Sequence, residues 1–427
     1  MKITLVCTEI PYPATNGSRI DMWRRIKAFA TQGTELQAIV WWFGTEPTLD
    51  EIAEIQKYVK KLHLFQIEQT WIARLGRIVD LLSYPLETTS RIIKGQNLSL
   101  LIDEVRNFNP DAIFLESIHG GVIATSLSQS LNIPLLTRSP NIEHLYAQKM
   151  LQSTIGLKDK LRRYLANIHL EKYEKSILKN SAFFYDISAD DLKFWQAAGF
   201  TNGRLLPPMI DFPDSETASF HNSISTTIPT KQIEEIPTSY DLVFLGNLYS
   251  ENNVAGLIWF LTEVWPIVRA QLPETTVLIA GSNPVPRIRQ ICDKTEGVTL
   301  KINPKSASDT YRSGRVLINP ILKGSGVKIK SIDMLTIGLP IVSTIEGVSG
   351  LPEAIKKYFI IASDAASFAA ASIEFLSAIQ RSSSALTEQK DNSDLPIIAD
   401  RELLESFFGN KIIQTVISDI ESIIQQQ

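Results

Sequence analysis

Short apolar runs alternate with longer amphipathic stretches along most of the chain. In the first half the intervening stretches, such as 21–31 and 98–107, carry apolar residues at helical spacing. The short runs are apolar throughout instead of alternating with polar residues, which is typical of parallel strands covered by helices on both faces. They predict strands at 3–7, 36–43, 62–66, 112–116, 134–137 and 182–186. We therefore expect an α/β domain with a doubly wound parallel sheet.

The pattern stops after Pro207-Pro208 and starts again at Tyr240. Residues 211–240 hold ten Ser or Thr and three Pro with no regular period, which indicates a linker or a long loop. A second series of strands follows at 240–246, 275–280, 298–302, 315–319, 340–343 and 358–361. Helices are expected between them at 253–270, 284–293, 327–337 and 365–379, followed by a polar loop at 381–398 and an amphipathic helix at 401–424.

We therefore predict two Rossmann-like doubly wound domains that face each other across a cleft. The expected limits are 1–210 for the first domain, 211–239 for the linker, 240–400 for the second domain and 401–427 for a C-terminal helix that packs back toward the first domain. In such sheets ligands bind at the carboxyl ends of the strands, so the cleft is the expected active site.

Composition removes several classes of function. The chain of 427 residues has 42 Lys and Arg against 46 Asp and Glu, and a net charge of −4 does not indicate a nucleic-acid binder. Two cysteines and five scattered histidines in no zinc motif give no reason to expect a metal or a cofactor. No secretory signal and no apolar run of membrane-spanning length is found, so a cytoplasmic protein is expected.

The most informative segment is 320–344, which is predicted to form a strand, a glycine turn, a helix and a second strand. Gly324 and Gly326 allow close approach of a ligand to the backbone at a helix start. Lys328 and Lys330 place cations where helices usually prefer carboxylates, which suits an arriving diphosphate. Asp333 is positioned to accept hydrogen bonds from the two hydroxyls of a ribose. The alternative is a solvated helix start with surface lysines.

This segment resembles the donor-binding signature of the retaining glycosyltransferases of family four, which have the two-domain GT-B architecture. Further segments resemble the same family. They are 244–253 and 277–281 in the second half, and 11–19, 138–143 and 185–190 in the first half. The resemblance extends over nearly the whole chain, and it is most specific at 320–350.

The resemblance implies that domain 240–400 binds the nucleotide sugar and domain 1–210 binds the acceptor, and it implies a role for individual residues. Asp333 takes the place of a glutamate that binds the nucleotide ribose, and Lys330 adds positive charge. The other implied donor residues are Gly246, Asn247, Ser325, Gly326, Val327 and Lys328. The implied residues on the acceptor side and the phosphate loop are Asn16, Gly17, Arg138, Asn141 and Glu143.

Three departures from the family pattern leave a second function open. Ser325 stands where many members have a glutamate, and Pro140 stands where a histidine is usual. The Arg and Lys that commonly follow the first strand of the C-terminal domain and hold the diphosphate are missing. From their charge, we expect Lys328 and Lys330 to take over this role. The alternative is a weakly active or inactive relative that binds a nucleotide or a glycan as a partner protein.

Two candidate catalytic groups follow the strand at 112–116. His119 lies between this strand and a glycine pair, where a neutral imidazole suits a hydrogen bond to the sugar or a proton transfer. Glu116 competes for that role, and Lys328 is the third catalytic candidate. The alternative for His119 is a loop side chain satisfied by the backbone. For Arg138, Asn141 and Glu143 it is a helix cap with a salt bridge.

We therefore expect a metal-independent retaining hexosyltransferase that uses a nucleoside diphosphate sugar and serves polysaccharide biosynthesis. The acceptor, a glycan, a lipid or a small molecule, is not given by the sequence, and neither are the base, the sugar and the oligomeric state. Trp41-Trp42-Phe43 and the basic, apolar segment 71–94 leave open a peripheral contact with the inner face of the membrane. The alternative for both is a packed element with solvated arginines.

Overall fold

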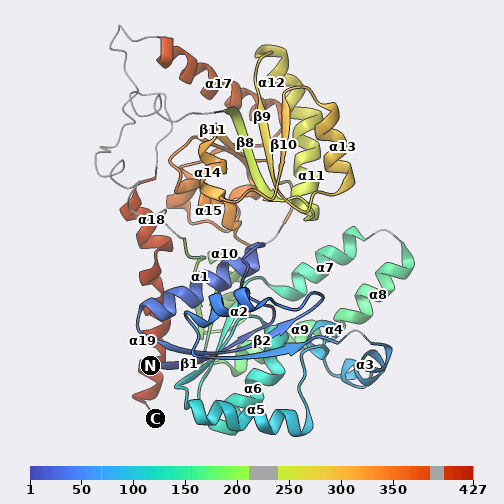
Figure 1. The fold of residues 1–427 in the computed structure, drawn as a ribbon, viewed down its shortest axis with the longest axis vertical. Coiled ribbons are helices and arrows are strands. Elements are labelled where there is room, and N and C mark those ends of the chain that lie inside the picture. Colours follow the sequence, from blue (N-terminus) through green and yellow to red (C-terminus); the bar gives the residue numbers. More distant parts are fainter. Residues whose placement is uncertain (69, 155, 211–238, 325, 385–398, 427) are drawn as a thin grey trace. The chain divides into compact units, whose positions relative to one another are not determined.

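The computed structural model describes residues 1–427 except 69, 155, 211–238, 325, 385–398 and 427. Three predicted features lie wholly or mostly outside the described residues. They are the donor residue Ser325, the linker 211–239 and the loop 381–398. The chain divides into two compact units, Met1–Met209 with Asn410–Gln427, and Ile210–Gly409. Both are parallel α/β units, so the predicted fold class of two Rossmann-like domains is confirmed (Figure 1).

The first unit is built on a seven-stranded parallel sheet with the order β3-β2-β1-β4-β5-β6-β7. Its strands are β1 (Lys2–Cys7), β2 (Glu35–Trp42), β3 (Lys61–Gln66), β4 (Ala112–Leu115), β5 (Leu135–Ser139), β6 (Phe183–Asp186) and β7 (Gly203–Leu205). Its helices are α1 (Gly17–Thr31), α2 (Leu49–Gln56), α3 (Trp71–Gly76), η1 (Asp80–Leu82), α4 (Leu86–Thr89), α5 (Gly95–Phe108), η2 (Ile118–Gly120), α6 (Gly121–Leu131), α7 (Glu143–Ser153), α8 (Leu157–Asn167), α9 (Leu170–Asn180), α10 (Ala189–Ala197), η7 (Asn410–Ile412) and α19 (Ile413–Ile424).

The second unit repeats this design with six parallel strands in the order β10-β9-β8-β11-β12-β13. Its strands are β8 (Tyr240–Asn247), β9 (Val277–Ser282), β10 (Val298–Ile302), β11 (Gly314–Asn319), β12 (Ile341–Thr344) and β13 (Ile360–Ala362). Its helices are α11 (Glu251–Trp259), η5 (Phe260–Val264), α12 (Trp265–Gln271), α13 (Pro286–Lys294), α14 (Ala307–Arg312), α15 (Ile329–Leu335), η6 (Glu346–Val348), α16 (Glu353–Lys356), α17 (Ala365–Ser384) and α18 (Arg401–Phe408).

The central strands are apolar throughout because successive side chains enter cores on opposite faces of the sheet. In β1, Leu5 packs in one core with Phe29 of α1, whereas its neighbour Val6 packs in another with Val105 of α5. In β8 the same division separates Phe244 from Val243. Two covered faces explain why the predicted strands of both halves match the observed ones within a few residues.

Two predicted helices are interrupted. The helix expected at 253–270 contains a π-helical turn at Phe260–Val264, directly before Pro266 in the first turn of α12. Proline lacks the amide hydrogen that the preceding turn requires, so the helix widens there. The helix expected at 401–424 ends at Phe408, because Gly409 leaves the helical conformation with an extended ψ of 163°. A side chain at Gly409 would also bring a Cβ to 2.4 Å from the carbonyl oxygen of Glu405. Strand β7 was not predicted.

The interruption at Gly409 divides the C-terminal segment between the two units. Phe408 and Leu404 of α18 lie in a core of the second unit. Val416 and Ile420 of α19 lie in the core of the first unit beside β1 and α1. The phenolic hydroxyl of Tyr185 in β6 donates a 2.9 Å hydrogen bond to Oδ2 of Asp419, so α19 is an integral part of the first unit.

Candidate active site

In the second unit the candidate donor residues lie where the strand order reverses, between β8 and β11. Parallel sheets of this order open a crevice at the carboxyl ends of these two strands. β8 ends at Asn247, and α11 begins four residues later at Glu251. β11 ends at Asn319, and the glycine turn and α15 follow it. The structure therefore brings 246–247 and 326–330 to the same edge of one sheet.

Asn253 connects these two segments directly. Its Nδ2 donates a 2.8 Å hydrogen bond to the carbonyl oxygen of Asn247, and its Oδ1 accepts one of 2.9 Å from Nζ of Lys330. The ammonium group of Lys330 also lies 4.4 Å from the ring centroid of Phe244 in β8. Lys330, which belongs to α15, is thereby held over the end of β8.

The environment of Lys330 is poor in compensating charge. Burial and the nearby Lys328 cation lower the pKa of Lys330 well below its ordinary value. Both causes oppose the charged form of Lys330. A bound anion would offset the repulsion between Lys330 and Lys328 and so favour the charged form. The cation is therefore destabilised in a way that a diphosphate would relieve.

The glycine turn before α15 carries the second lysine. Nζ of Lys328 donates a 2.8 Å hydrogen bond to the carbonyl oxygen of Gly326, whose φ of 63° lies in the left-handed region that favours glycine. A Cβ on Gly324 would lie 3.0 Å from Nζ of Lys328 and 3.4 Å from Nδ2 of Asn252. The turn therefore packs tightly against the lysine and against the first turn of α11.

Buried polar groups hold helix α15 against the end of β11 and the turn at Gly347. Nδ2 of Asn319 donates a 2.9 Å hydrogen bond to Oγ of Ser331, which donates one of 2.7 Å to the carbonyl oxygen of Gly347. Asp333, three residues after Lys330, is partly exposed on the same short helix, as is Val327 in the turn before it. The anchor fixes the rotation of the helix and thus the positions of Lys330 and Asp333.

Asn252 and Asn253 were missed by the sequence analysis, which considered only charged residues after the first strand of this domain. Their amide side chains carry no charge signal, and their only sequence signal is their position just after β8. In the structure Asn253 contacts Lys330, one of the two cations that we substituted for the missing Arg and Lys, and Asn252 lies beside Gly324 in the turn that carries Lys328. The substitution of Lys330 is therefore matched by a contact with α11.

In the first unit, Asn16 and Gly17 form the start of α1. Oδ1 of Asn16 accepts a 3.0 Å hydrogen bond from the backbone amide of Arg19, which is the usual role of an N-cap side chain. The Nε of Arg19 lies 2.8 Å from Oε2 of Glu9, in the loop after β1. These contacts bring the loop and the helix start together at the carboxyl end of β1.

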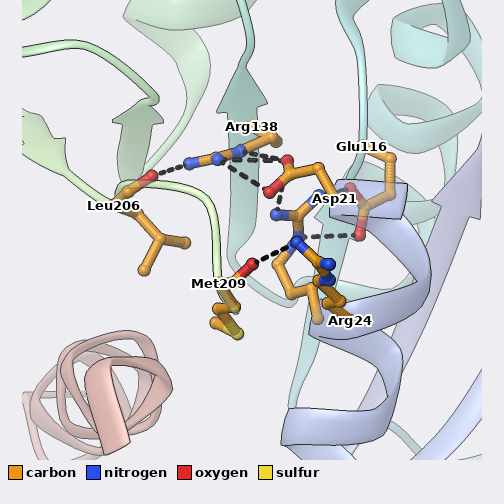
Figure 2. Close-up of polar contacts among 7 residues, drawn as sticks. Asp21, Arg24, Glu116, Arg138, Leu206 and Met209 are labelled. Atoms are coloured by element: carbon orange, nitrogen blue, oxygen red, sulfur yellow. Dashed lines mark hydrogen bonds and ion pairs between the residues drawn. The ribbon is translucent and has the colours of Figure 1, made fainter. Parts of the chain in front are cut away.

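Glu116 and Arg138 belong to a buried ion-pair network (Figure 2). Both oxygens of Glu116 accept from Arg25 of α1, with Nε of Arg25 at 3.1 Å from Oε1. Nη1 of Arg25 lies 2.8 Å from Oδ2 of Asp21, which also accepts from Nη2 of Arg138 at 3.1 Å. All four side chains are at most 6% exposed.

This network gives partners to two predicted residues. Two arginines and two carboxylates balance in charge, and Arg138 also donates to the carbonyl oxygen of Leu206. Buried charges need such partners because water is excluded from them. For Arg138 this is the salt bridge that the sequence analysis left open as the alternative. The catalytic role of Glu116 and the acceptor-binding role of Arg138 stay predictions. Arg24 of α1, the neighbour of Arg25, donates a 3.0 Å hydrogen bond to the carbonyl oxygen of Met209, as Figure 2 shows.

His119 lies in the turn η2 after β4. Its Nε2 is 3.4 Å from Oε2 of Glu87 on α4, and its Nδ1 is buried without a hydrogen-bond partner among the described residues. Burial lowers the pKa of His119, an effect that the Glu87 carboxylate opposes and the Arg91 cation strengthens. A neutral imidazole results at neutral pH, as the sequence analysis expected of a sugar-binding histidine.

Glu143 begins α7, which follows the next strand of the sheet, β5. Burial and the carboxylates of Glu174 and Glu87 raise the pKa of Glu143 to about 8, although a hydrogen bond from Asn141 opposes this. Glu174 accepts from the backbone amides of Glu143 and His144 at 2.7 and 3.0 Å, so it caps α7. The Glu87 carboxylate acts to raise the pKa of both His119 and Glu143, so the two predicted residues share this charged neighbour. They are separate from the ion-pair network of Glu116.

The predicted membrane segments are exposed only in part. Trp41 is 2% exposed and packs in a core, whereas Phe43 is 63% and Trp71 is 70% exposed, so the peripheral contact stays a prediction. Arg91 turns inward, with its Nε donating a 2.9 Å hydrogen bond to the carbonyl oxygen of Thr8. Within the described residues, no helix combines the length and apolar character that crossing a membrane requires, and no cluster of three potential metal ligands occurs.

Comparisons with known proteins agree with this fold. Residues 239–378 match the family model of glycosyl transferases group 1. An uncharacterized 44.6 kDa protein in the cps region of Klebsiella pneumoniae is 27% identical over 392 residues, which cover 86% of this chain and 89% of that protein.

Solved structures resemble both units together. Sucrose-phosphate synthase from Thermosynechococcus elongatus is 14% identical, with a TM-score of 0.64 and full coverage of both chains at 100%. HepE from Anabaena, solved with UDP and glucose, is 12% identical, with a TM-score of 0.59 over 99% of this chain and 100% of that chain. The chain therefore has the GT-B fold, and its second unit matches a glycosyltransferase domain.

Proposed function

We propose that the protein is a glycosyltransferase that moves a sugar from a nucleoside diphosphate donor to a glycan, lipid or small-molecule acceptor. The second unit binds the donor and the first unit binds the acceptor. The observation that carries the proposal is the pair Lys328 and Lys330, held by a glycine turn and by Asn253 within the segment that matches group 1 glycosyl transferases. The UDP and sugar complexes of HepE support this donor class.

The proposed chemistry is electrostatic. The two lysines stabilise the negative charge that develops on the leaving diphosphate, so catalysis needs no metal ion. Asp333 accepts hydrogen bonds from the ribose hydroxyls, and Gly246 and Asn247 provide hydrogen-bonding groups beside the diphosphate. The neutral imidazole of His119 binds the transferred sugar, and the residues near Glu143 face the acceptor. Retention of the anomeric configuration follows from the resemblance to family four.

The alternative of an inactive binding protein was motivated by the missing Arg and Lys after β8. Nζ of Lys330 lies 2.9 Å from the side chain of Asn253 in the first turns of α11, so a cation is present close to the position of the missing ones. This contact supports an active enzyme over an inactive relative. The relative in a cps region supports polysaccharide biosynthesis as the setting.

A thermal-shift panel with uridine, guanosine, thymidine, adenosine and cytidine diphosphates, without added metal, tests donor binding. A nucleotide at 100 times its dissociation constant stabilises the fold by about 2.7 kcal/mol. We expect one base to raise the melting temperature clearly, and the matching sugar nucleotides then serve as donors in an assay for released nucleoside diphosphate. If no nucleotide stabilises the protein, the donor site is wrong. Binding without turnover in the presence of candidate acceptors would favour the binding protein.

A further inference from the structure

Helix α8 presents its apolar side to solvent. Five apolar residues follow one another at helical spacing, and each of them is more than half exposed, from 51% for Ile168 to 88% for Leu157. The set consists of Leu157, Leu161, Tyr164, Leu165 and Ile168. At about 100° per residue they form one stripe about 100° wide. A stripe of this kind normally packs on the core of the protein.

The opposite side of α8 faces the protein. Ala166 and Asn167 are the half-buried residues of this helix, and α8 packs on α7 and α4. The helix therefore contacts its own unit through small and polar side chains, and none of its residues is fully buried. The usual arrangement of an amphipathic surface helix is reversed.

Positive charge flanks the apolar stripe on both sides. Lys158 and Arg162 follow one border of the stripe, and Lys160 follows the other. Arg163 lies between Ala166 and Asn167, on the side that faces the protein. Asp159 is the one carboxylate within the helix. Cations beside an apolar stripe that carries a tyrosine fit the interface of an anionic bilayer, where acyl chains meet acidic headgroups.

The exposed apolar surface continues onto the neighbouring elements. Leu86 on α4, which packs against α8, is 40% exposed, and Leu82 on η1, which packs against α4, is 75% exposed. α4 also carries Glu87, the partner of His119. The surface therefore lies beside the residues proposed for the acceptor side.

We propose that α8, with Leu82 and Leu86, is a docking surface for a membrane that contains anionic lipid. The helix lies in the plane of the bilayer, with its apolar stripe among the acyl chains and Lys158, Lys160 and Arg162 at the headgroups. This docking is independent of the proposed enzymatic activity, since the lysines of the donor site are on the other unit.

Cosedimentation of the full chain with lipid vesicles tests the proposal. We expect binding to phosphatidylcholine vesicles that contain 30% phosphatidylglycerol, and much weaker binding to phosphatidylcholine alone. The double variant Leu161→Asp/Leu165→Asp should reduce the partition coefficient at least tenfold. Lys158→Glu/Arg162→Glu should reduce it about fivefold or more for each cation and remove most of its salt dependence.

Leu100→Asp is the matched control, because Leu100 on α5 is 55% exposed, as is Leu165. It should bind vesicles as the wild type does, and nucleotide-induced stabilisation in the absence of vesicles should be unchanged in all variants. Wild-type protein that ignores anionic vesicles, or equal binding by the Leu161→Asp/Leu165→Asp variant, overturns the proposal. A wild-type dimer that becomes monomeric in this variant without vesicle binding would make α8 an interface between copies instead. If nucleotides do not raise the melting temperature of the wild-type protein, this result counts against the donor site. It does not bear on the docking surface.

Discussion

Nζ of Lys330 and Oδ1 of Asn253 lie 2.9 Å apart and join the helix after the glycine turn to the helix after β8. An uncharged amide thus fixes the position of a lysine whose pKa is lowered by burial and by Lys328. Asn253 stabilises the cation without neutralising it. An anionic ligand beside Lys330 would therefore favour its charged form.

Lys330→Gln should weaken binding of the nucleoside diphosphate by at least tenfold, since a hydrogen bond to a charged group contributes about 1.5–3 kcal/mol. Calorimetric titration measures the loss. Lys294→Gln is the matched control, because Lys294 is exposed at the end of α13 in the same unit and should not change affinity. Equal affinity of the Lys330→Gln variant and the wild type would contradict the donor site.

The affinity for the nucleotide should fall as the pH rises through the lowered pKa of Lys330. Bound diphosphate favours the protonated form of Lys330, whose pKa in the free protein is lowered. Binding is therefore stronger below this pKa and is lost above it. Titrations over a pH series that stays below the ordinary pKa of lysine should give a clear slope for the wild type and a flatter one for Lys330→Gln. Parallel slopes in both proteins would assign the pH dependence to other groups.

Asp333→Ala should weaken binding of ribonucleotides more than that of their 2′,3′-dideoxy analogues. The carboxylate is expected to accept hydrogen bonds only from ribose hydroxyls, so the analogue lacks the interaction from the start. The expected loss is about 1.5–3 kcal/mol for the ribonucleotide. An equal loss for both ligands would indicate a structural role of Asp333 in α15.

Arg25→Met should lower the free energy of unfolding by about 3–5 kcal/mol, because it leaves the Glu116 carboxylate buried without its partner. Arg19→Met is the control on the same helix. It breaks the partly exposed pair with Glu9 and should cost less than about 1 kcal/mol. Urea unfolding compares the two. Similar losses in both variants would show that the buried network adds little to stability.

Glu143→Gln should stabilise the protein at pH 8 and above. The pKa of Glu143 is raised to about 8 in the folded protein, so its contribution to stability is full below the unfolded pKa and is lost as the pH rises toward 8. The variant should gain about 1–3 kcal/mol at alkaline pH and almost nothing at pH 4, measured as melting temperatures across this range.

Glu171→Gln is the control for this pH dependence. The hydrogen bond with Lys175 lowers the pKa of Glu171, an effect of the opposite sign on an exposed carboxylate. This variant should gain no stability at alkaline pH. If Glu143→Gln shows the same profile as Glu171→Gln, the carboxyl group of Glu143 titrates normally.

The sequence by itself determined the elements and the fold class. Covered parallel strands must be apolar on both faces, so runs such as 240–246 were visible without any tertiary information. The glycines and lysines of 320–330 were equally visible, since their chemistry lies in the residue types. The resemblance to a family then linked this segment to a nucleotide-sugar site.

Only the tertiary structure decided which polar residues meet. Glu116 had the same sequence context as a catalytic carboxylate, but Arg25, 91 positions away, accounts for both of its oxygens. Asn253 had no signal beyond its place after a strand, and its contact with Lys330 spans 77 positions. The exposure of α8 could not be predicted either. The spacing of apolar residues shows that a helix has an apolar side, but not whether that side packs on the protein or faces solvent. Such partners are set by the order of the strands in a sheet, which local sequence patterns do not encode.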